Sequence, residues 1–249
     1  MQRAVFVLLS VLMLVVGFAS CSSSSGGGDA VTGADTTVDH GSNPLALTVC
    51  DPSKGPFSND KIDNEFFPLP VGMKHVLEGQ DADKGGLVRV EITVLDKTET
   101  IAGVVTRVVE EREFANDILF EVSRNFFVQA PDGTVCYFGE DVDEYDTDQV
   151  TITGHSGQWR ADGTTNKPGI QMPAHPAVGM TYAHEDAPKV AQDNADVTAL
   201  GTSTTTPAGT FTDTLVTSEW SPLEPDVSPK VFARGVGLIV DATYLLKTK

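Results

Sequence analysis

The chain has 249 residues, of which 17 are Lys or Arg and 35 are Asp or Glu, giving a formal net charge of −18. A surplus of acidic residues argues against nucleic acid as a partner, because phosphate binding needs a basic face. Anionic lipid headgroups should also repel the folded part, so any membrane attachment needs another cause. The length suffices for one domain with a sizeable core.

The first 20 residues have the composition of an export signal. Arg3 is their only charge, and an apolar run over residues 4–18 precedes Ala19-Ser20-Cys21. A positive start, a short apolar core and small residues before the cut are typical of a leader that is removed. The unbroken part, residues 4–16, is shorter than the roughly 20 apolar residues of a spanning helix. We therefore expect a signal peptide over residues 1–20.

The end of this leader resembles the bacterial lipobox, in which a cysteine carries diacylglycerol and becomes the new N-terminus. The matching residues are Phe18-Ala19-Ser20-Cys21, with Phe18 where that motif usually has Leu. An ordinary secretory signal is the alternative, but Cys21 lies where the apolar run ends and a Ser/Gly-rich stretch begins. The resemblance implies palmitate-type acylation at Cys21, and two or three acyl chains anchor stably. We expect a lipoprotein of the cell envelope, at the outer membrane if the host has one.

Residues 21–61 have the composition of a tether. They are mostly Ser, Gly, Asp, Thr and Pro with few large apolar side chains, so they cannot bury enough surface to offset chain entropy. We expect this stretch to be disordered. Removal of residues 1–20 takes away Arg3, and the remaining 16 basic against 35 acidic residues give the mature chain a charge of −19.

Two cysteines remain once Cys21 is acylated. An exported protein meets an oxidising compartment, where an even number of thiols favours disulfides. We predict a bridge between Cys50 and Cys136. The alternatives are two buried free thiols or a metal pair, although no other Cys or His stands at zinc-ligand spacing from either residue.

The rest of the chain, residues 62–246, reads as a β-rich domain. Apolar residues alternate over 88–94, as in a strand with one face in water. Residues 104–109 and 118–122 are β-branched or aromatic runs of strand length. Further candidate strands lie at 134–138, 150–153, 157–160, 180–184, 196–200, 211–220 and 238–245.

Helical periodicity is missing from this domain, and its absence decides the expected architecture. Parallel strands need long crossovers that are usually helical, so neighbouring strands should be antiparallel. We predict a mainly β fold with a single, strongly curved antiparallel sheet, in the form of a half-barrel or open barrel. A β-sandwich is the alternative. The section between Gly139 and Ala195, rich in Pro, Gly and acidic residues, is where functional loops are expected.

The densest charge cluster, residues 140–148, is a candidate calcium site. Carboxylates at alternate positions could supply several of the oxygens that calcium takes. The EF-hand pattern fails, because Asp146 and Ile152 occupy the sixth and twelfth positions counted from Asp141. If calcium binds, Asp141, Asp143 and Asp146 are the expected ligands. An acidic, solvated turn is the alternative, and no other cofactor is indicated.

No set of residues for catalysis is indicated by the sequence. Gly154-His155-Ser156-Gly157 lacks the Gly-x-Ser-x-Gly spacing of a hydrolase elbow. Most aromatic residues should belong to the core, since aromatics dominate core burial. Trp159, beside a Pro/Gly-rich loop, is the candidate for ligand contact.

Several phrases resemble a family of uncharacterised bacterial lipoproteins and exported hypothetical proteins. They lie at residues 66–72, 133–142, 168–174 and 235–238. A weaker likeness, at residues 206–211 and the late strand, is to periplasmic half-barrels that carry lipoproteins or lipids. Those carriers lay helices across the concave side of the sheet, and no such helices are expected here. The family resemblance implies an envelope location and no activity.

The resulting hypothesis is a non-enzymatic, membrane-anchored domain that binds a protein or a hydrophobic small molecule. One alternative is an envelope hydrolase that uses carboxylates of residues 139–148 with a histidine such as His155. Another is a purely structural surface lipoprotein. An enclosed apolar cavity favours carriage of a ligand, a filled core favours interaction or structure, and carboxylates that converge with a histidine in a cleft favour an enzyme.

Overall fold

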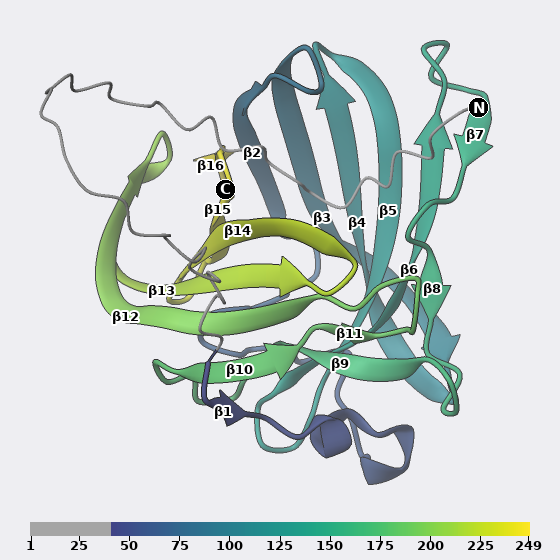
Figure 1. The fold of residues 1–249 in the computed structure, drawn as a ribbon, viewed down its shortest axis with the longest axis vertical. Coiled ribbons are helices and arrows are strands. Elements are labelled where there is room, and N and C mark those ends of the chain that lie inside the picture. The colour runs from purple at the N-terminus through teal and green to yellow at the C-terminus, as the bar shows by residue number, and fades with distance from the viewer. Residues whose placement is uncertain (1–40) are drawn as a thin grey trace, which may run out of the picture.

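The computed structural model describes residues 41–249, which are almost entirely β (Figure 1). Its early strands are β1 (Asn43–Pro44), β2 (Lys74–Asp81), β3 (Gly86–Ile101), β4 (Val104–Ala115), β5 (Ile118–Gln129), β6 (Val135–Tyr145), β7 (Ile152–Gly154) and β8 (Trp159–Arg160). The later ones are β9 (Lys167–Met172), β10 (Met180–Ala183), β11 (Glu185–Asp186), β12 (Asn194–Thr206), β13 (Gly209–Ser221), β14 (Glu224–Ala233), β15 (Gly237–Asp241) and β16 (Tyr244–Thr248). Two short 3-10 helices, η1 (Leu47–Cys50) and η2 (Pro52–Lys54), precede β2.

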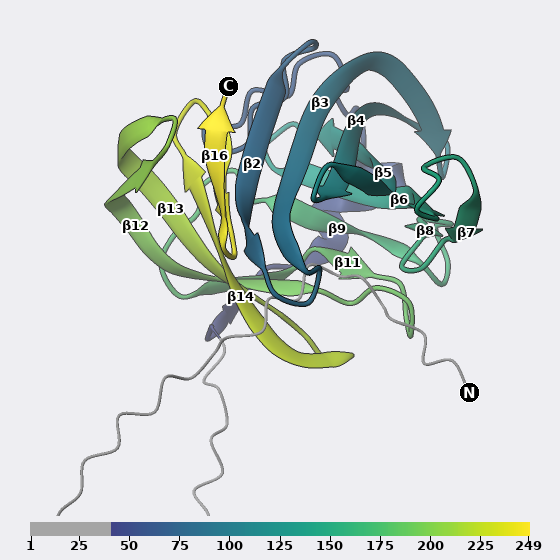
Figure 2. The same ribbon diagram turned by 90° about the horizontal axis from the view of Figure 1, so that it is seen from above.

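All the strands of the described part belong to one sheet, in the order β1-β10-β12-β13-β14-β15-β16-β2-β3-β4-β5-β6-β9-β11, with β7 and β8 also paired to β6. Every pair is antiparallel except β1 with β10. The sheet bends round so that β12–β14 face β3–β6 across its interior, and it does not close (Figure 2). The predicted single curved antiparallel sheet is therefore confirmed, and the β-sandwich alternative does not apply.

Two-residue turns with left-handed backbone connect the longest neighbouring strands. Ala102 and Gly103 have φ of 49° and 80° between β3 and β4, and Asn116 and Asp117 have φ of 50° and 67° between β4 and β5. Positive φ at both central residues is the hairpin geometry whose twist matches that of the flanking strands. These turns set the register that determines which side chains face the interior of the curve.

Each predicted strand overlaps an observed one, although residues 150–151 and 157–158 lie outside β7 and β8. The expected single strand over residues 238–245 is two strands, β15 and β16, because Ala242 turns the chain with φ of 51°. Strands β1, β2, β9, β11 and β14 are additional to the prediction. Strand β14 contains Pro225 and Pro229, residues that usually exclude a segment from a sheet.

An aromatic cluster ties the two halves of the sheet together. The ring of Phe67 lies edge-on to Phe127 of β5 at 5.4 Å and to Phe232 of β14 at 6.1 Å between centroids. Phe127 in turn stacks on Tyr137 of β6 at 4.9 Å. Each fully buried apolar side chain contributes about 1.5–3 kcal/mol, and aromatic pairs add to this. The cluster therefore holds β5, β6 and β14 at a fixed separation.

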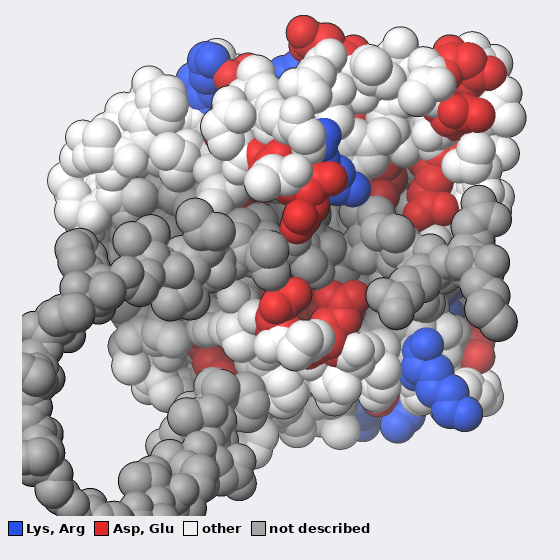
Figure 3. Space-filling view, turned by 45° about the horizontal axis from the view of Figure 1, so that its top comes forward, with Lys and Arg blue, Asp and Glu red and all other residues white. Residues whose placement is uncertain are grey.

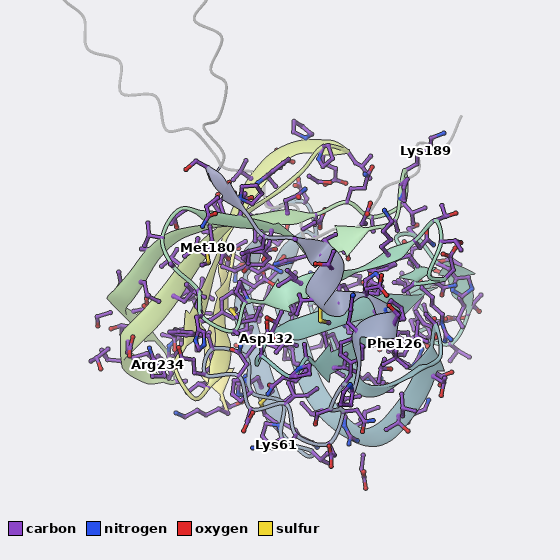
Figure 4. The ribbon with its side chains drawn as sticks, turned by 90° about the horizontal axis from the view of Figure 1, so that it is seen from below. Lys61, Phe126, Asp132, Met180, Lys189 and Arg234 are labelled. Atoms are coloured by element: carbon purple, nitrogen blue, oxygen red, sulfur yellow. A yellow bond between two sulfur atoms is a disulfide. The ribbon has the colours of Figure 1, made fainter. Side chains whose placement is uncertain are left out.

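Residues 41–61, which the sequence analysis assigns to the tether, lie against the domain. Strand β1 pairs with β10, and a disulfide joins Cys50 of η1 to Cys136 of β6 across 86 residues (Figure 4). Phe57 packs edge-on against Phe138 at 5.9 Å. A covalent link and one aromatic anchor suffice to fix a segment whose composition alone predicts disorder.

The signal peptide over residues 1–20, Cys21 and the tether up to residue 40 lie outside the described residues. Within residues 41–249, no helix has the length and apolar character needed to cross a membrane.

Candidate functional site: an acidic cleft inside the curved sheet

The interior of the curve contains a cavity of about 200 Å³, lined by residues from both halves of the sheet. Part of its wall is apolar, with Phe67, Leu69, Met73, Ile92, Val109, Phe127, Phe232 and Leu238. The rest is acidic, with Glu111, Glu113, Glu121, Glu140, Glu185, Asp193, Glu219, Glu224, Asp226 and Asp241. We call this space the acidic cleft. Asp and Glu side chains gather at the centre of this side of the molecule (Figure 3).

Strand alternation places the carboxylates of β4 and β5 in the acidic cleft. Glu111 and Glu113 lie opposite Ile92 and Val90 of β3, so they share the face that β3 covers with apolar residues. Glu121 of β5 lies directly opposite Glu113. Successive side chains of a strand point to opposite faces, so these positions cannot face solvent on the outer side. Like charges opposed across strands destabilise a sheet, which favours protonation of one partner.

Strand β6 contributes Tyr137 and Glu140, although they are three positions apart and a regular strand would send them to opposite faces. The pairing of β5 with β6 shifts register between Asn125 and Phe127, which turns both side chains to the interior. Gly139 makes this possible, because its φ is 120° and a Cβ there would lie 2.4 Å from the Trp159 carbonyl oxygen. The Tyr137 hydroxyl donates a hydrogen bond of 2.6 Å to Asn125 Oδ1.

The carboxyls on this wall have strongly raised pKa values. Burial raises the pKa of Glu111 and of Glu121 to about 7, with Lys230 and Lys84 respectively opposing the shift. The pKa of Glu113 is well above its ordinary value through burial and the charges of Glu121 and Glu111. Burial and the charge of Glu185 do the same for the pKa of Glu140. Much of this wall is therefore protonated near neutral pH.

The facing wall holds the only lysine that lines the acidic cleft, among residues 41–249. Lys230 Nζ of β14 lies 3.1 Å from Glu219 Oε2 and 3.5 Å from Asp241 Oδ2. Burial by itself lowers the pKa of Lys230, but the two carboxylates outweigh it and the pKa rises well above its ordinary value. Lys230 is therefore charged, and two carboxylates already share it.

A histidine stands beside this group. His184 Nδ1 is 3.7 Å from Glu219 Oε1, and burial together with the charge of Lys230 lowers the pKa of His184 to about 3. The imidazole is therefore neutral. Next to it, burial and the charge of Asp193 raise the pKa of Glu185 to about 8, and burial raises that of Asp193 to about 6.

Several buried polar atoms of the acidic cleft make no hydrogen bond to any residue of the described part of the chain. They are His184 Nε2, Glu185 Oε2, Asp193 Oδ1, Glu219 Oε1 and Asp241 Oδ1. The side chains of His184, Glu185 and Asp241 belong to residues only 6–7% exposed. A buried polar group without a partner costs about 1–3 kcal/mol, and native proteins contain few. A concentration of such atoms in one cavity indicates a place for a ligand.

Gly169 of β9 fixes the position of His184. A Cβ at residue 169 would lie 1.9 Å from the His184 carbonyl oxygen and 2.8 Å from that of Ala183. Only glycine permits this close approach between β9 and the chain segment that joins β10 to β11. His184 and Glu185 are thereby held at the place where the two ends of the sheet approach each other.

Trp159, the predicted ligand contact, lies behind the cleft wall. It is 3% exposed, packs edge-on against Tyr137 at 5.5 Å, and its Nε1 donates a hydrogen bond of 3.2 Å to Glu185 Oε1. Its role is to hold Glu185 in place. The tryptophan that lines the acidic cleft is Trp220 of β13.

The carboxylates proposed for calcium each have another partner in the fold. Residues up to Tyr145 continue strand β6, so the expected acidic loop is shorter than predicted. Asp141 pairs with Arg160, Asp143 lies 2.9 Å from Arg124, and Asp146 accepts a hydrogen bond from the Thr147 amide. Within residues 41–249, no three His, Cys, Asp or Glu side chains are placed to hold a metal ion.

His155, the histidine named for a hydrolase, also lies away from the acidic cleft. Its Nδ1 is 2.5 Å from the Val142 carbonyl oxygen and 3.3 Å from Asp143 Oδ1 on the outer face of β6. Glu140, which is on the same strand β6 as Asp143, faces the interior instead, because the side chains of a strand alternate between its two faces.

Sequence reasoning missed every carboxylate that lines the acidic cleft outside the cluster at residues 140–148. The available signal was the run 109–113, in which Val109, Glu111 and Glu113 occupy the positions that a core-facing strand normally fills with apolar residues. Acidic residues at alternate positions on both sides of a predicted hairpin indicate a polar interior face. The raised pKa values and the partners from β13–β15 have no sequence signal, because they depend on how the sheet curves.

By its fold and its cleft, the protein is an open, curved antiparallel sheet with an acidic interior. No family model matches the chain, and no curated protein matches it. Among solved structures, the chain is similar to a protein described as exported, with a YmcC-like fold, from Bacteroides fragilis. The identity is 15%, the TM-score is 0.30, and the match covers 74% of this chain and 98% of that one.

A second solved structure comes from Parabacteroides distasonis and is described as a lipoprotein. It has 17% identity and a TM-score of 0.28, and the match covers 74% of this chain and 97% of the other.

Proposed function

We propose that the chain is a lipoprotein of the cell envelope, held by acyl groups on Cys21, whose β domain binds a small organic ligand in the acidic cleft. The leader and the lipobox-like residues support the anchor. The binding role depends on one observation: the cavity collects buried polar atoms that make no hydrogen bond within residues 41–249. Ligand sites are concave and combine apolar side chains with placed polar groups, and the cleft has both kinds of wall, with ten carboxyls among its polar groups.

Native mass spectrometry of the full chain, isolated from its own host in mild detergent, tests this proposal. We expect a population with one small molecule in excess of the acylated polypeptide, which a denaturing measurement removes. The matched control is Gly169→Leu, whose side chain collides with the His184 carbonyl and displaces one wall of the cleft. A chain of bare polypeptide mass under gentle conditions, together with an unacylated Cys21, contradicts the proposal.

A hydrolase is the second candidate, because carboxylates and a histidine converge in the acidic cleft. His184, with its pKa lowered to about 3, and Glu185, with its pKa raised to about 8, lie side by side. Groups whose environments separate their pKa values in this way can divide the roles of base and acid. The carboxylates of residues 139–148 contribute only Glu140 to this group, so the catalytic pair differs from the one expected from sequence.

Turnover of chromogenic esters and glycosides distinguishes the two candidates. Hydrolysis that disappears in Glu185→Gln and persists in the exposed control Asp83→Asn favours the hydrolase. Equal background rates in all three proteins favour binding without chemistry. Because Gln retains an oxygen for the Trp159 hydrogen bond, Glu185→Gln removes the titrating group while keeping the contact that positions it.

A further inference from the structure

We infer that the acidic cleft takes an organic cation, a protonated amine carried on an apolar or aromatic body. This inference rests on the proposed binding function and names the chemical class of the ligand. It depends on the charge of the lining residues, on the kind of atoms that lack partners, and on the apolar part of the wall.

The lining charges are unbalanced. Ten carboxyl side chains line the acidic cleft, and Lys230 is its only Lys or Arg among residues 41–249. The two histidines that line it, His75 and His184, do not compensate, since burial lowers the pKa of each. An anionic ligand would add to this imbalance, whereas a cation reduces it. Buried charges are normally paired, so the cleft lacks positive charge.

The unpartnered atoms are mostly acceptors. Four of them are carboxyl oxygens without a hydrogen bond among residues 41–249: Glu185 Oε2, Asp193 Oδ1, Glu219 Oε1 and Asp241 Oδ1. An ammonium group has three donors and no acceptor, which is the complement of this set. Hydrogen bonds between an ammonium and a carboxylate are about twice as strong as neutral ones.

The apolar part of the cleft wall indicates that the ligand carries a hydrophobic group as well as a positive charge. Phe67, Phe127, Trp220 and Phe232 line the same cavity as the carboxyls. Aromatic faces attract cations and also bury apolar groups. An inorganic ion would leave this side without a partner, so the ligand that fits has an amine at one end and a hydrophobic body at the other.

Binding of such a ligand is coupled to proton release. Glu185 faces Asp193, Glu219 and Glu140, with Trp159 donating to it and with His184 and Lys230 nearby on the same wall. A cation favours the ionised carboxylate and therefore lowers its pKa toward ordinary values. Below the pKa values of Glu185 and Asp193 in the free protein, the ligand must displace protons from these carboxyls. Its affinity should therefore rise with pH between about 6 and 8.

Three probes that share an indole ring test the inference on the full chain by calorimetry at pH 8. Tryptamine carries an ammonium, tryptophol a hydroxyl, and indole-3-propionate a carboxylate. We expect tryptamine to bind at least tenfold more tightly than tryptophol, and indole-3-propionate to bind most weakly. The tryptamine affinity should fall at least threefold at pH 6, with protons released on binding in proportion.

Variants separate the charge effect from damage to the fold. Glu185→Gln should weaken tryptamine at least tenfold and leave tryptophol within twofold, and Asp83→Asn on the exposed β2–β3 turn should change neither. If Glu185→Gln does not fold, the comparison of the three probes on the native chain still decides. Tryptophol binding as tightly as tryptamine, or no binding of tryptamine at millimolar concentration, overturns the inference. A ligand retained in native mass spectrometry in either case would leave the proposed binding function standing.

Discussion

The two faces of strands β4–β6 carry the same kind of residue in opposite circumstances. On the outer face, Glu110 and Asp143 lie 3.6 Å and 2.9 Å from the guanidinium of Arg124, and Asp141 pairs with Arg160. On the inner face, Glu113, Glu121 and Glu140 have no such partners and their pKa values are raised.

This difference shows that the acidic residues behind the net charge of the chain belong to two groups in different environments. Outer carboxylates are matched by arginines and serve solubility and local order. Inner carboxylates are kept in a poorly solvated space with one lysine, at a cost in stability. Proteins retain such a cost mainly where a site needs it, which is why we propose the inner face as the ligand-binding one.

The largest expected change in stability follows from removal of Lys230, the only lysine or arginine that lines the acidic cleft among residues 41–249. Lys230→Met leaves Glu219 and Asp241 buried without a partner, and the loss of one member of a buried pair costs about 3–5 kcal/mol. Urea unfolding at pH 8 measures this loss. The exposed control Lys54→Met should cost nothing measurable. An equal stability of Lys230→Met and the wild type at pH 8 would show that the two carboxylates do not depend on Lys230.

Glu121→Gln is expected to stabilise the protein, by less than Lys230→Met destabilises it. The folded pKa of about 7 lies above the ordinary value of 4.5, so the native state holds more protons and stability falls as pH rises from about 4.5 to 7. At pH 8 the substitution should stabilise the protein by about 1–3 kcal/mol, and at pH 4, below the pKa of both states, by almost nothing. Thermal unfolding at both pH values measures the difference. Asp117→Asn, at a residue whose side chain is 88% exposed, is the matched control.

The same linkage applies to the whole domain between about pH 7.5 and 8.5. In this window His184 and His75 are neutral in the folded state, since burial lowers the pKa of each, and in the unfolded chain they are almost wholly neutral because an ordinary histidine titrates near 6.5. The inner carboxyls are then the buried groups that titrate, so the unmodified protein should lose stability as pH rises. A stability that rises or stays level across this window is incompatible with a protonated inner face.

Trp159→Phe should have a moderate effect on stability, because it keeps an aromatic ring against Tyr137 but removes the hydrogen bond to Glu185 and leaves a small cavity. The expected cost is about 1–3 kcal/mol. The pKa of Glu185 should rise further, because that hydrogen bond lowers it. Chemical denaturation measures the first quantity, and the pH dependence of tryptamine binding reports the second. A change in tryptophol affinity as large as that for tryptamine would instead place Trp159 in direct contact with the ligand.

The smallest effect is expected on the outer face. Arg124→Met removes the partner of Glu110 and Asp143 where both can still reach water, and exposed pairs contribute about 0–1 kcal/mol. Its effect should not depend on pH between 6.5 and 8. A loss comparable to that of Lys230→Met would remove the distinction between the two faces.

The sequence predicts the architecture better than the site. Alternation over residues 88–94 and the missing helical stripes suffice for a curved antiparallel sheet, because both are local properties of the chain. The acidic cleft depends instead on pairs such as Glu113 with Glu121 and Lys230 with Asp241. Hairpin register sets the first pair, and the curvature that brings β14 and β15 to face β4 determines which groups surround the second.

The cluster at residues 140–148 shows, within one segment, that sequence does not reveal which side chains face the cleft. Its residues are uniformly acidic, and sequence alone cannot tell that β6 sends Glu140 inward and Asp141 outward to Arg160. The bulge at Gly139 sets this choice. Likewise, the composition of residues 41–61 predicts a tether, whereas the Cys50–Cys136 disulfide fixes that segment to the domain.

Side-chain carboxyl carbon shifts, followed by NMR across a pH titration of protein with labelled glutamate, test the central claim most directly. The account predicts that inner glutamates such as Glu111, Glu121 and Glu185 titrate between about pH 7 and 8 in the free protein, and that tryptamine moves Glu185 to lower pH. Titration of all glutamates near pH 4 to 5, unchanged by tryptamine, would contradict it.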